Sequence, residues 1–248
     1  MRTGLFIGDM HAESKFGLTL TPESAAQRKL SSLWKEMATT VKPDFVVVNG
    51  DCCEGWNPKE KARWLMTSDM AEQVDTAVEF LNMIKGDPDF VFTEGSGYHV
   101  GQNMSLDELV SRDMRGEFGT DKAIDLKDEG IKIHACHNVG YSAVPAYRTT
   151  AIARELMVAT INADTLGQYD ILLRSHVHYH VYVEYGHTAG HVLPCWKVRD
   201  PFAMKKGLAM NPKVGWVVYE FYDDGTFQYD RRKSKLVDVK NQIGRVIL

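Results

Sequence analysis

The chain has 248 residues, of which 44% are hydrophobic and 25% are charged, as expected for a single globular domain with a sizeable core. The formal net charge of −4 argues against a protein that grips nucleic acid mainly through bulk positive charge. No Pro/Gly/Ser-rich linker divides the sequence, and no apolar run approaches the roughly 20 residues that span a bilayer. We therefore predict one domain over residues 1–248.

Apolar runs and helical patterns alternate along the first 180 residues. Five runs are predicted as strands: 3–8, 45–48, 90–92, 131–136 and 170–173. Between them, helical spacing predicts a helix over 21–41 that begins at Thr21-Pro22-Glu23, one long or two shorter helices over 59–84, and a helix over 147–166. A polar, helix-tolerant stretch ends near Arg115. This alternation is typical of an α/β fold.

The last third of the chain is predicted to be mostly strand. The β-rich runs are 180–185, 191–193, 215–222 and 226–229. Asp223-Asp224-Gly225 is typical of a hairpin turn between the last two runs.

Four of the predicted strands end in acidic or imidazole side chains. These residues are Asp9 and His11, Asp51, His137, and His176 and His178. In open α/β sheets, ligands bind beyond the carboxyl ends of the strands, so residues far apart in sequence can meet there. Two carboxylates and four imidazoles are a typical donor set for two divalent cations. The sequence therefore predicts a two-metal site.

The spacing of these residues predicts how they share the metals. Asp9 and His11 are alternate residues, which share one face of an extended chain, so both can bind one metal. His176 and His178 have the same spacing. An extended chain would aim both imidazoles into the site, whereas a turn would direct them to different metals.

The remaining two candidates differ in their roles. Asp51 has two carboxylate oxygens, which can bridge two cations about 3.5–4 Å apart. His137 ends its strand and can supply a nitrogen to the second metal. His134 is the alternative, but it lies three residues earlier and so on the opposite face of the strand. The strand-end position favours His137.

Cysteines and basic residues are assigned structural roles. Adjacent Cys52 and Cys53, with no CxxC pair, argue against a disulfide framework, and the chain begins without a signal-peptide pattern. We therefore expect reduced thiols in a cytoplasmic protein. Thiolate ligation by Cys52, Cys53 or Cys136 stays open, although a structural role as small buried side chains is favoured.

Lys197 and its basic neighbours are interpreted as a solvated face.

The order of these motifs resembles that of the calcineurin-like metallophosphoesterases. The matching segments are Asp9-Met10-His11, Gly50-Asp51-Cys52-Cys53-Glu54, Gly97-Tyr98-His99, His137 and Ser175-His176-Val177-His178. The family motifs are D-x-H, G-D-x-x, G-N-H, a lone His, and G-H-x-H. The segment Pro194-Cys195-Trp196-Lys197 and the β-rich end are similar to small phosphoesterases of phages and prophages.

The resemblance implies a fold and a set of roles. The fold would be a four-layer α/β/β/α sandwich of two mixed sheets, with 181–248 completing the second sheet. The site would hold two ions of Mn, Fe, Zn or a similar metal. One metal would be bound by Asp9, His11 and His178, the other by His137 and His176, with Asp51 bridging and His99 near the leaving group as a non-ligand catalytic residue.

The chain departs from the family pattern at two positions. Tyr98 stands where the family has an asparagine that binds the second metal. Ser96, Asn103 or water are candidates to replace that ligand. The change of glycine to Ser175 in the last motif is milder.

Hydrolysis of a phosphate ester is the expected reaction. Two cations on one water would lower its pKa and yield a metal-bound hydroxide. We expect a phosphodiesterase acting on nucleotides or single-stranded nucleic acid, with a phosphomonoesterase, a mononuclear hydrolase and a non-catalytic scaffold as alternatives. Four aromatic residues could stack a base, although core packing is favoured for them: Trp56, Trp64, Tyr98 and Trp196.

Overall fold

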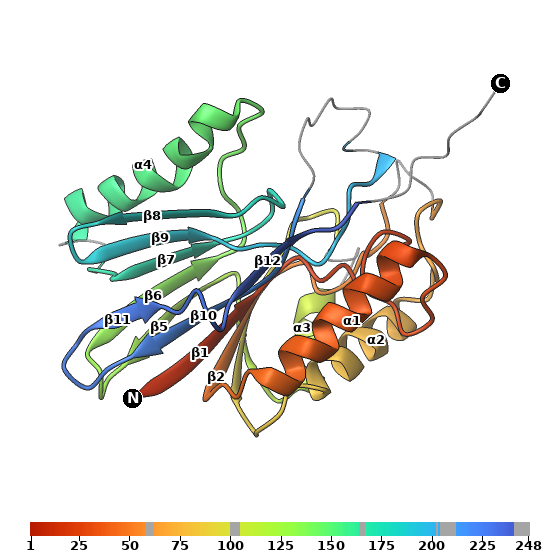
Figure 1. The fold of residues 1–248 in the computed structure, drawn as a ribbon, viewed down its shortest axis with the longest axis horizontal. Coiled ribbons are helices and arrows are strands. Elements are labelled where there is room, and N and C mark those ends of the chain that lie inside the picture. Colours follow the sequence, from red (N-terminus) through yellow and green to blue (C-terminus); the bar gives the residue numbers. More distant parts are fainter. Residues whose placement is uncertain (58–61, 100–104, 164–166, 202, 204–211, 241–248) are drawn as a thin grey trace.

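Two β-sheets pack face to face in the computed structural model, which describes residues 1–57, 62–99, 105–163, 167–201, 203 and 212–240 (Figure 1). Helices α1, α2 and α3 cover the outer face of one sheet, and α4 covers the outer face of the other (Figure 1). Their bounds are α1 Ala25–Thr40, α2 Met70–Asn82, α3 Leu106–Asp113 and α4 Arg148–Ile161. The four-layer α/β/β/α sandwich is therefore confirmed.

The first sheet contains the N-terminal strands and the C-terminal ones. Its order is β11-β10-β1-β2-β3-β4, and β12 also pairs with β10. The bounds are β1 Arg2–Ile7, β2 Phe45–Asn49, β3 Asp89–Thr93, β4 Glu117–Gly119, β10 Lys213–Phe221, β11 Phe227–Tyr229 and β12 Lys235–Asp238. Strands β1 to β4 are parallel, so their carboxyl ends meet at one edge.

The second sheet has the order β5-β6-β7-β9-β8. The bounds are β5 Asp121–Leu126, β6 Ile131–Cys136, β7 Ile171–Arg174, β8 Val181–Tyr185 and β9 Thr188–Val192. Of the described residues in the C-terminal part, only those of β8 and β9 belong to this sheet. The expectation that all of 181–248 would do so is wrong, because β10 pairs with β1 and carries β11 and β12 into the first sheet.

Burial on both faces explains the continuous apolar runs of the central strands. In β1, Leu5 and Ile7 pack beneath the helices, whereas Phe6 faces the second sheet. Strand β2 divides its valines in the same way, since successive side chains point to opposite faces. Trp34 of α1 completes the outer layer and donates its indole N–H to the carbonyl of Phe80 at 2.8 Å.

Two helix starts differ from the predictions. Helix α1 begins after Ser24, because the Ser24 hydroxyl accepts the backbone N–H of Gln27 while the Gln27 side chain accepts that of Ser24. This reciprocal pair starts the helix three residues later than an N-cap at Thr21 would. Helix α2 begins after Asp69, whose carboxylate accepts the N–H of Ala71. Residues 62–69 are therefore not helical.

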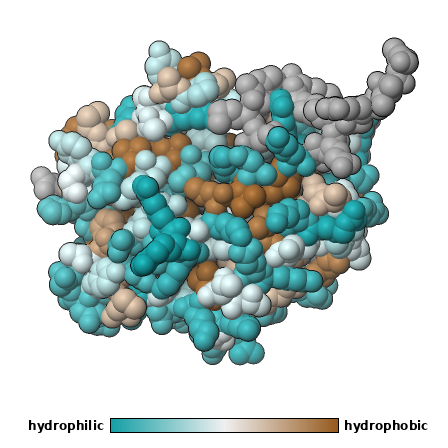
Figure 2. All heavy atoms as spheres, viewed as in Figure 1, coloured by the Kyte–Doolittle hydropathy of each residue, from teal (hydrophilic) through white to brown (hydrophobic). Residues whose placement is uncertain are grey.

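The face seen in Figure 2 is largely hydrophilic, and hydrophobic side chains gather in short bands across its middle. No helix in the described part of the chain is both long and apolar enough to cross a membrane.

Candidate metal centre

The loops after β1 and β2 run side by side. The N–H of Asp9 donates to the carbonyl of Gly50 at 3.0 Å, and the N–H of His11 donates to that of Asp51 at 3.0 Å. A third bond from Ala12 to Cys52 at 2.9 Å continues the pairing. Because both strands are parallel and neighbours, these bonds hold the two acidic loops together beyond one edge of the sheet.

Most of the candidate ligands have a left-handed backbone. The residues with positive φ include Asp9, His11, Asp51, His176 and His178, with φ of 52°, 48°, 54°, 73° and 55°. Such conformations cost roughly 1–3 kcal/mol each for residues other than glycine and concentrate at functional sites. The prediction that Asp9 and His11 meet because alternate residues of an extended chain share one face is therefore wrong. Their side chains meet because the loop coils, since β1 has already ended at Ile7.

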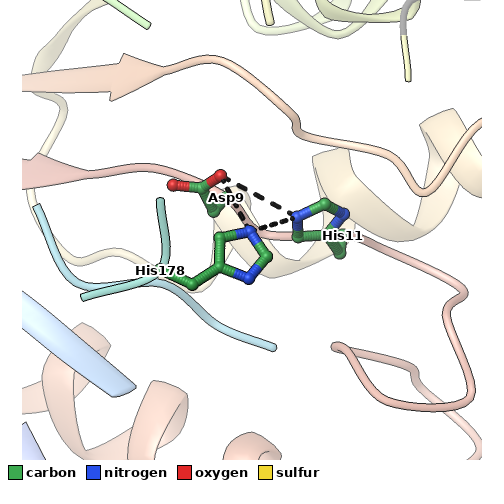
Figure 3. Close-up of side chains that lie close together, drawn as sticks. All are labelled: Asp9, His11 and His178. Carbon is green, nitrogen blue, oxygen red and sulfur yellow. Dashed lines mark hydrogen bonds and ion pairs between the residues drawn. The ribbon is translucent and has the colours of Figure 1, made fainter. Parts of the chain in front are cut away.

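Asp9, His11 and His178 form the first group of ligand atoms, all within 4.8 Å of one another. Figure 3 shows the three side chains pointing toward a common point. His178 Nε2 lies 3.2 Å from Asp9 Oδ1 and 3.1 Å from His11 Nε2. His11 Nε2 lies 3.8 Å from the same Asp9 oxygen.

Asp51, His137 and His176 form the second group, again within 4.8 Å. His137 Nε2 lies 3.1 Å from Asp51 Oδ2, while its Nδ1 bonds to the carbonyl of Asn49 at 2.8 Å. His176 and His178 thus belong to different groups, as expected for a turn between them and not for an extended chain. The groups adjoin, because His137 Nε2 also lies 3.9 Å from Asp9 Oδ1.

The alternative to His137 lies elsewhere. His134 is on β6, where its Nε2 lies 3.0 Å from Asp121 and its ring packs against Tyr169. The cysteines also stay out of both groups, and the four thiols are free. Burial raises the pKa of Cys52 and Cys53 well above the usual value, which disfavours thiolates.

Two buried polar atoms support the presence of cations. Asp9 Oδ1 and His137 Nε2 are buried and make no hydrogen bond within the described part of the chain. They face other ligand-type atoms at the distances above. Leaving such atoms unsatisfied is costly, and a divalent cation in each group would satisfy one of them. Mixed oxygen and imidazole donors suit Zn, Mn or Fe.

Opposite charges lie close together in the second group. Burial favours the neutral form of His137, but Asp51 and Asp9 outweigh it and raise the pKa of His137 to about 10. Burial also opposes ionisation of Asp51, yet His137 and His99 hold the pKa of that carboxyl well below its usual value. A cation that binds here competes with the proton on His137, so binding releases it.

A buried ion pair orients His11. Glu54 Oε2 lies 2.9 Å from His11 Nδ1, which leaves Nε2 directed at the first group. Lys197 Nζ lies 2.8 Å from Glu54 Oε1 and 3.2 Å from Asp200 Oδ2. Carboxylates in this position fix the tautomer of a ligating histidine.

Sequence reasoning missed this pair. Lys197 is 4% exposed, so its interpretation as part of a solvated face is wrong. Glu54 ends the motif Gly50-Asp51-Cys52-Cys53-Glu54, and this position could have marked it as a candidate site residue. Nothing in the sequence connects it to a lysine 143 residues away.

Ser96 contacts the candidate bridging carboxylate. Its N–H donates to Asp51 Oδ1 at 2.7 Å, and its hydroxyl lies 3.2 Å from Asp51 Oδ2. Tyr98, the residue aligned with the family asparagine, is instead 53% exposed. Of the candidates to replace the family asparagine, Ser96 thus contacts a residue of the second group. Asn103 lies outside the described residues.

His99 lies beside both groups. Its ring is 4.6 Å from that of His11, and its Nδ1 bonds to the carbonyl of Glu54. Ligand atoms of His99, His11 and Asp51 also fall within 4.8 Å of one another. His99 is thus placed to act on a group bound between the two sets of ligands.

Gly95 is required by close packing against Asp51. A Cβ at this position would lie 2.1 Å from Asp51 Oδ1. We expect Gly95→Ala to displace the carboxylate and weaken Mn²⁺ binding at least about tenfold, which calorimetric titration measures. Gly97→Ala is the matched control, because a Cβ there meets nothing within 4 Å. Equal affinities for the two variants would show that the Asp51 position does not matter.

Comparisons with known proteins extend the result for the fold. No protein-family model matches the chain, and no curated protein matches it. An archaeal phosphodiesterase superposes with a TM-score of 0.50 at 10% identity over 95% of this chain and 99% of that one. Vps29 of Chaetomium thermophilum gives 0.50 at 10% identity over 96% and 95%. Vps29 of Entamoeba histolytica complexed with zinc gives 0.46 at 16% identity over 96% and 99%.

The first two superpositions cover nearly the whole of both chains. At such low identity they bear on the fold alone. The chain shares the fold of these two proteins, and its candidate ligands lie in the loops that follow β1, β2, β6 and β7.

Proposed function

We propose that this protein is a binuclear metal-dependent phosphodiesterase that acts on nucleotides or single-stranded nucleic acid. The main support is the pair of adjoining ligand groups, each with one carboxylate and two imidazoles, on a metallophosphoesterase fold. Asp9, His11 and His178 would hold one cation. His137 and His176 would hold the other, with Asp51 between them.

Each protein group has a definite task in this proposal. A pair of divalent ions, Mn, Fe, Zn or similar, would lower the pKa of a shared water and offset the charge of the phosphate oxygens. Glu54 keeps His11 in the correct tautomer, and Ser96 holds Asp51 in place by two hydrogen bonds. His99 would donate a proton, or a hydrogen bond, to the leaving oxygen.

Exposed aromatic side chains around the site support a substrate with bases. Trp56 and Tyr98 lie in the loops that carry Glu54 and His99, and both are exposed. Tyr141 is also exposed, with its ring 6.3 Å from that of Tyr179, the neighbour of His178. Such rings can stack successive bases without reading their sequence. Trp196 cannot contribute, because it is buried against Trp34 and Trp216.

His99→Ala tests the role of the non-ligand histidine. We expect kcat for bis(p-nitrophenyl) phosphate with Mn²⁺ to fall about a hundredfold, because general acid catalysis typically contributes that much or more. Metal content should stay the same. His187→Ala, at an exposed hairpin, is the matched control. Unchanged kcat would remove His99 from the reaction, and a parallel loss of metal would make it a ligand.

A screen of substrates with added Mn²⁺ tests the proposal as a whole. The panel is bis(p-nitrophenyl) phosphate, p-nitrophenyl phosphate, cyclic nucleotides and a single-stranded oligonucleotide. We expect the diesters to be hydrolysed with higher kcat/KM than the monoester. A preference for the monoester would identify a phosphomonoesterase. No turnover and no bound metal would favour a scaffold that has kept only the fold.

A further inference from the structure

A cavity that shares no residue with the metal centre lies at the edge of the sandwich. It is lined from β8 of one sheet and from β11, β12 and their connection in the other (Figure 1). Its volume is about 360 Å³, and its lining consists of His180, Tyr182, Tyr229, Arg231, Ser234 and Leu236. Cavities that bind small molecules typically begin at about 300 Å³, so this one can take a small ligand.

Aromatic rings form one continuous wall of the cavity. The ring centroids of Tyr182 and Tyr229 are 5.2 Å apart. His191 backs both of them, at 5.3 Å from Tyr182 and 4.9 Å from Tyr229. Both tyrosines are only partly buried. Partly exposed π surface of this kind stacks on a planar ligand such as a base.

A hydrogen-bonded chain fixes the ring of His180. Its Nε2 lies 2.7 Å from Nε2 of His191, and Nδ1 of His191 lies 3.0 Å from the hydroxyl of Tyr219. His191 is fully buried, so the chain runs into the core. Nδ1 of His180 has no partner among the residues described and is left for the edge of a ligand.

Arg231 supplies a positive charge at the cavity. Its guanidinium lies 5.6 Å from the ring centroid of Tyr229. Within the described ranges no carboxylate pairs with it, whereas Arg232 and Lys233 beside it both pair with Asp230 at 3.9 Å. The acid near the opposite wall, Glu184, accepts the hydroxyl of Tyr182. The donors of Arg231 are thus left for an anion.

We propose that this cavity binds a nucleoside monophosphate. The base would stack on Tyr182 and Tyr229, His180 would hydrogen-bond to its edge, and Arg231 would bind the phosphate. A planar ring with polar edges and a terminal anion combines the features that these residues complement. The site is separate from hydrolysis, because none of its residues belongs to the metal groups.

Calorimetric titration of AMP tests the proposal, with EDTA present to exclude binding through metals. We expect one saturable site in the wild type and in Asp51→Asn, so that failure of the hydrolase proposal leaves this result unchanged. Arg231→Gln should weaken AMP binding about tenfold and leave adenosine binding unchanged, because it removes a charge-assisted contact to the phosphate. Arg232→Gln is the matched control, on a side chain that is 92% exposed.

Separate titrations identify which part of the ligand is recognised. Tyr182→Leu should weaken AMP and adenosine alike, since both carry the base. Inorganic phosphate alone should bind much more weakly than AMP. Absence of AMP binding at millimolar concentration, or equal binding by the wild type, Arg231→Gln and Tyr182→Leu, would overturn the proposal.

Discussion

Asp51→Asn is expected to lower kcat for diester hydrolysis by about a thousandfold or more. The carboxylate of Asp51 adjoins His137 and is held by Ser96, and it is the member of the second group that lies near His11 and His99. Asparagine keeps the shape but removes the charge and one potential ligand oxygen. Loss of a shared ligand to two cations forfeits several kcal/mol of transition-state stabilisation, and about 4 kcal/mol corresponds to a thousandfold.

Steady-state kinetics and metal content on the same preparations measure this effect. Asp121→Asn is the matched control, because Asp121 makes a comparable contact to a histidine, His134, but on exposed β5. Its kinetics should match the wild type. If Asp51→Asn retains both metal and turnover, Asp51 does not bridge and the arrangement of the site is wrong.

Lys197→Met is expected to destabilise the protein by about 3–5 kcal/mol. The variant removes the main cation from Glu54, whose side chain is only 12% exposed, and breaking a largely buried pair from one side typically costs this much. Burial opposes the charged form of Lys197, but Glu54 and Asp200 outweigh it and hold the pKa of the ammonium above its usual value. Denaturant unfolding with a two-state analysis measures the free energy.

Two further variants separate the buried charge from other effects. Lys213→Met removes a similar pair with Asp238 at 2.8 Å on the surface and should cost no more than about 1 kcal/mol. Combining Lys197→Met with Glu54→Gln should recover much of the loss, because no unpaired charge remains at position 54. A cost for Lys197→Met no greater than that for Lys213→Met would contradict the importance of the buried pair.

The strands were predictable because burial dictates their composition. Strands β2 and β6 lie where the apolar runs predicted them, since the interior strands must be apolar on one or both faces. Strands β4, β5 and β12 were missed. Strand β5 exposes alternate residues and β12 is short and half-exposed, so neither carries a strong apolar signal.

The sequence allowed the residues of the candidate site to be identified, but not the backbone conformation of the loops that carry them. Strand ends converge by topology, so Asp9, Asp51 and His137 could be grouped from sequence. The left-handed backbone of the ligand loops could not, because Asp and His adopt positive φ more often than other non-glycine residues but still only in a small minority of cases. Contacts such as Glu54 with Lys197 depend on tertiary packing between loops far apart in the sequence.

Metal analysis of crystals grown with Mn²⁺ tests the two-metal centre most directly, through anomalous scattering and the number of ions per chain. We predict two ions, one bound by Asp9, His11 and His178 and one by His137 and His176, with Asp51 between them. A structure without ions at these side chains, or with a single ion bound elsewhere, would contradict the proposed centre.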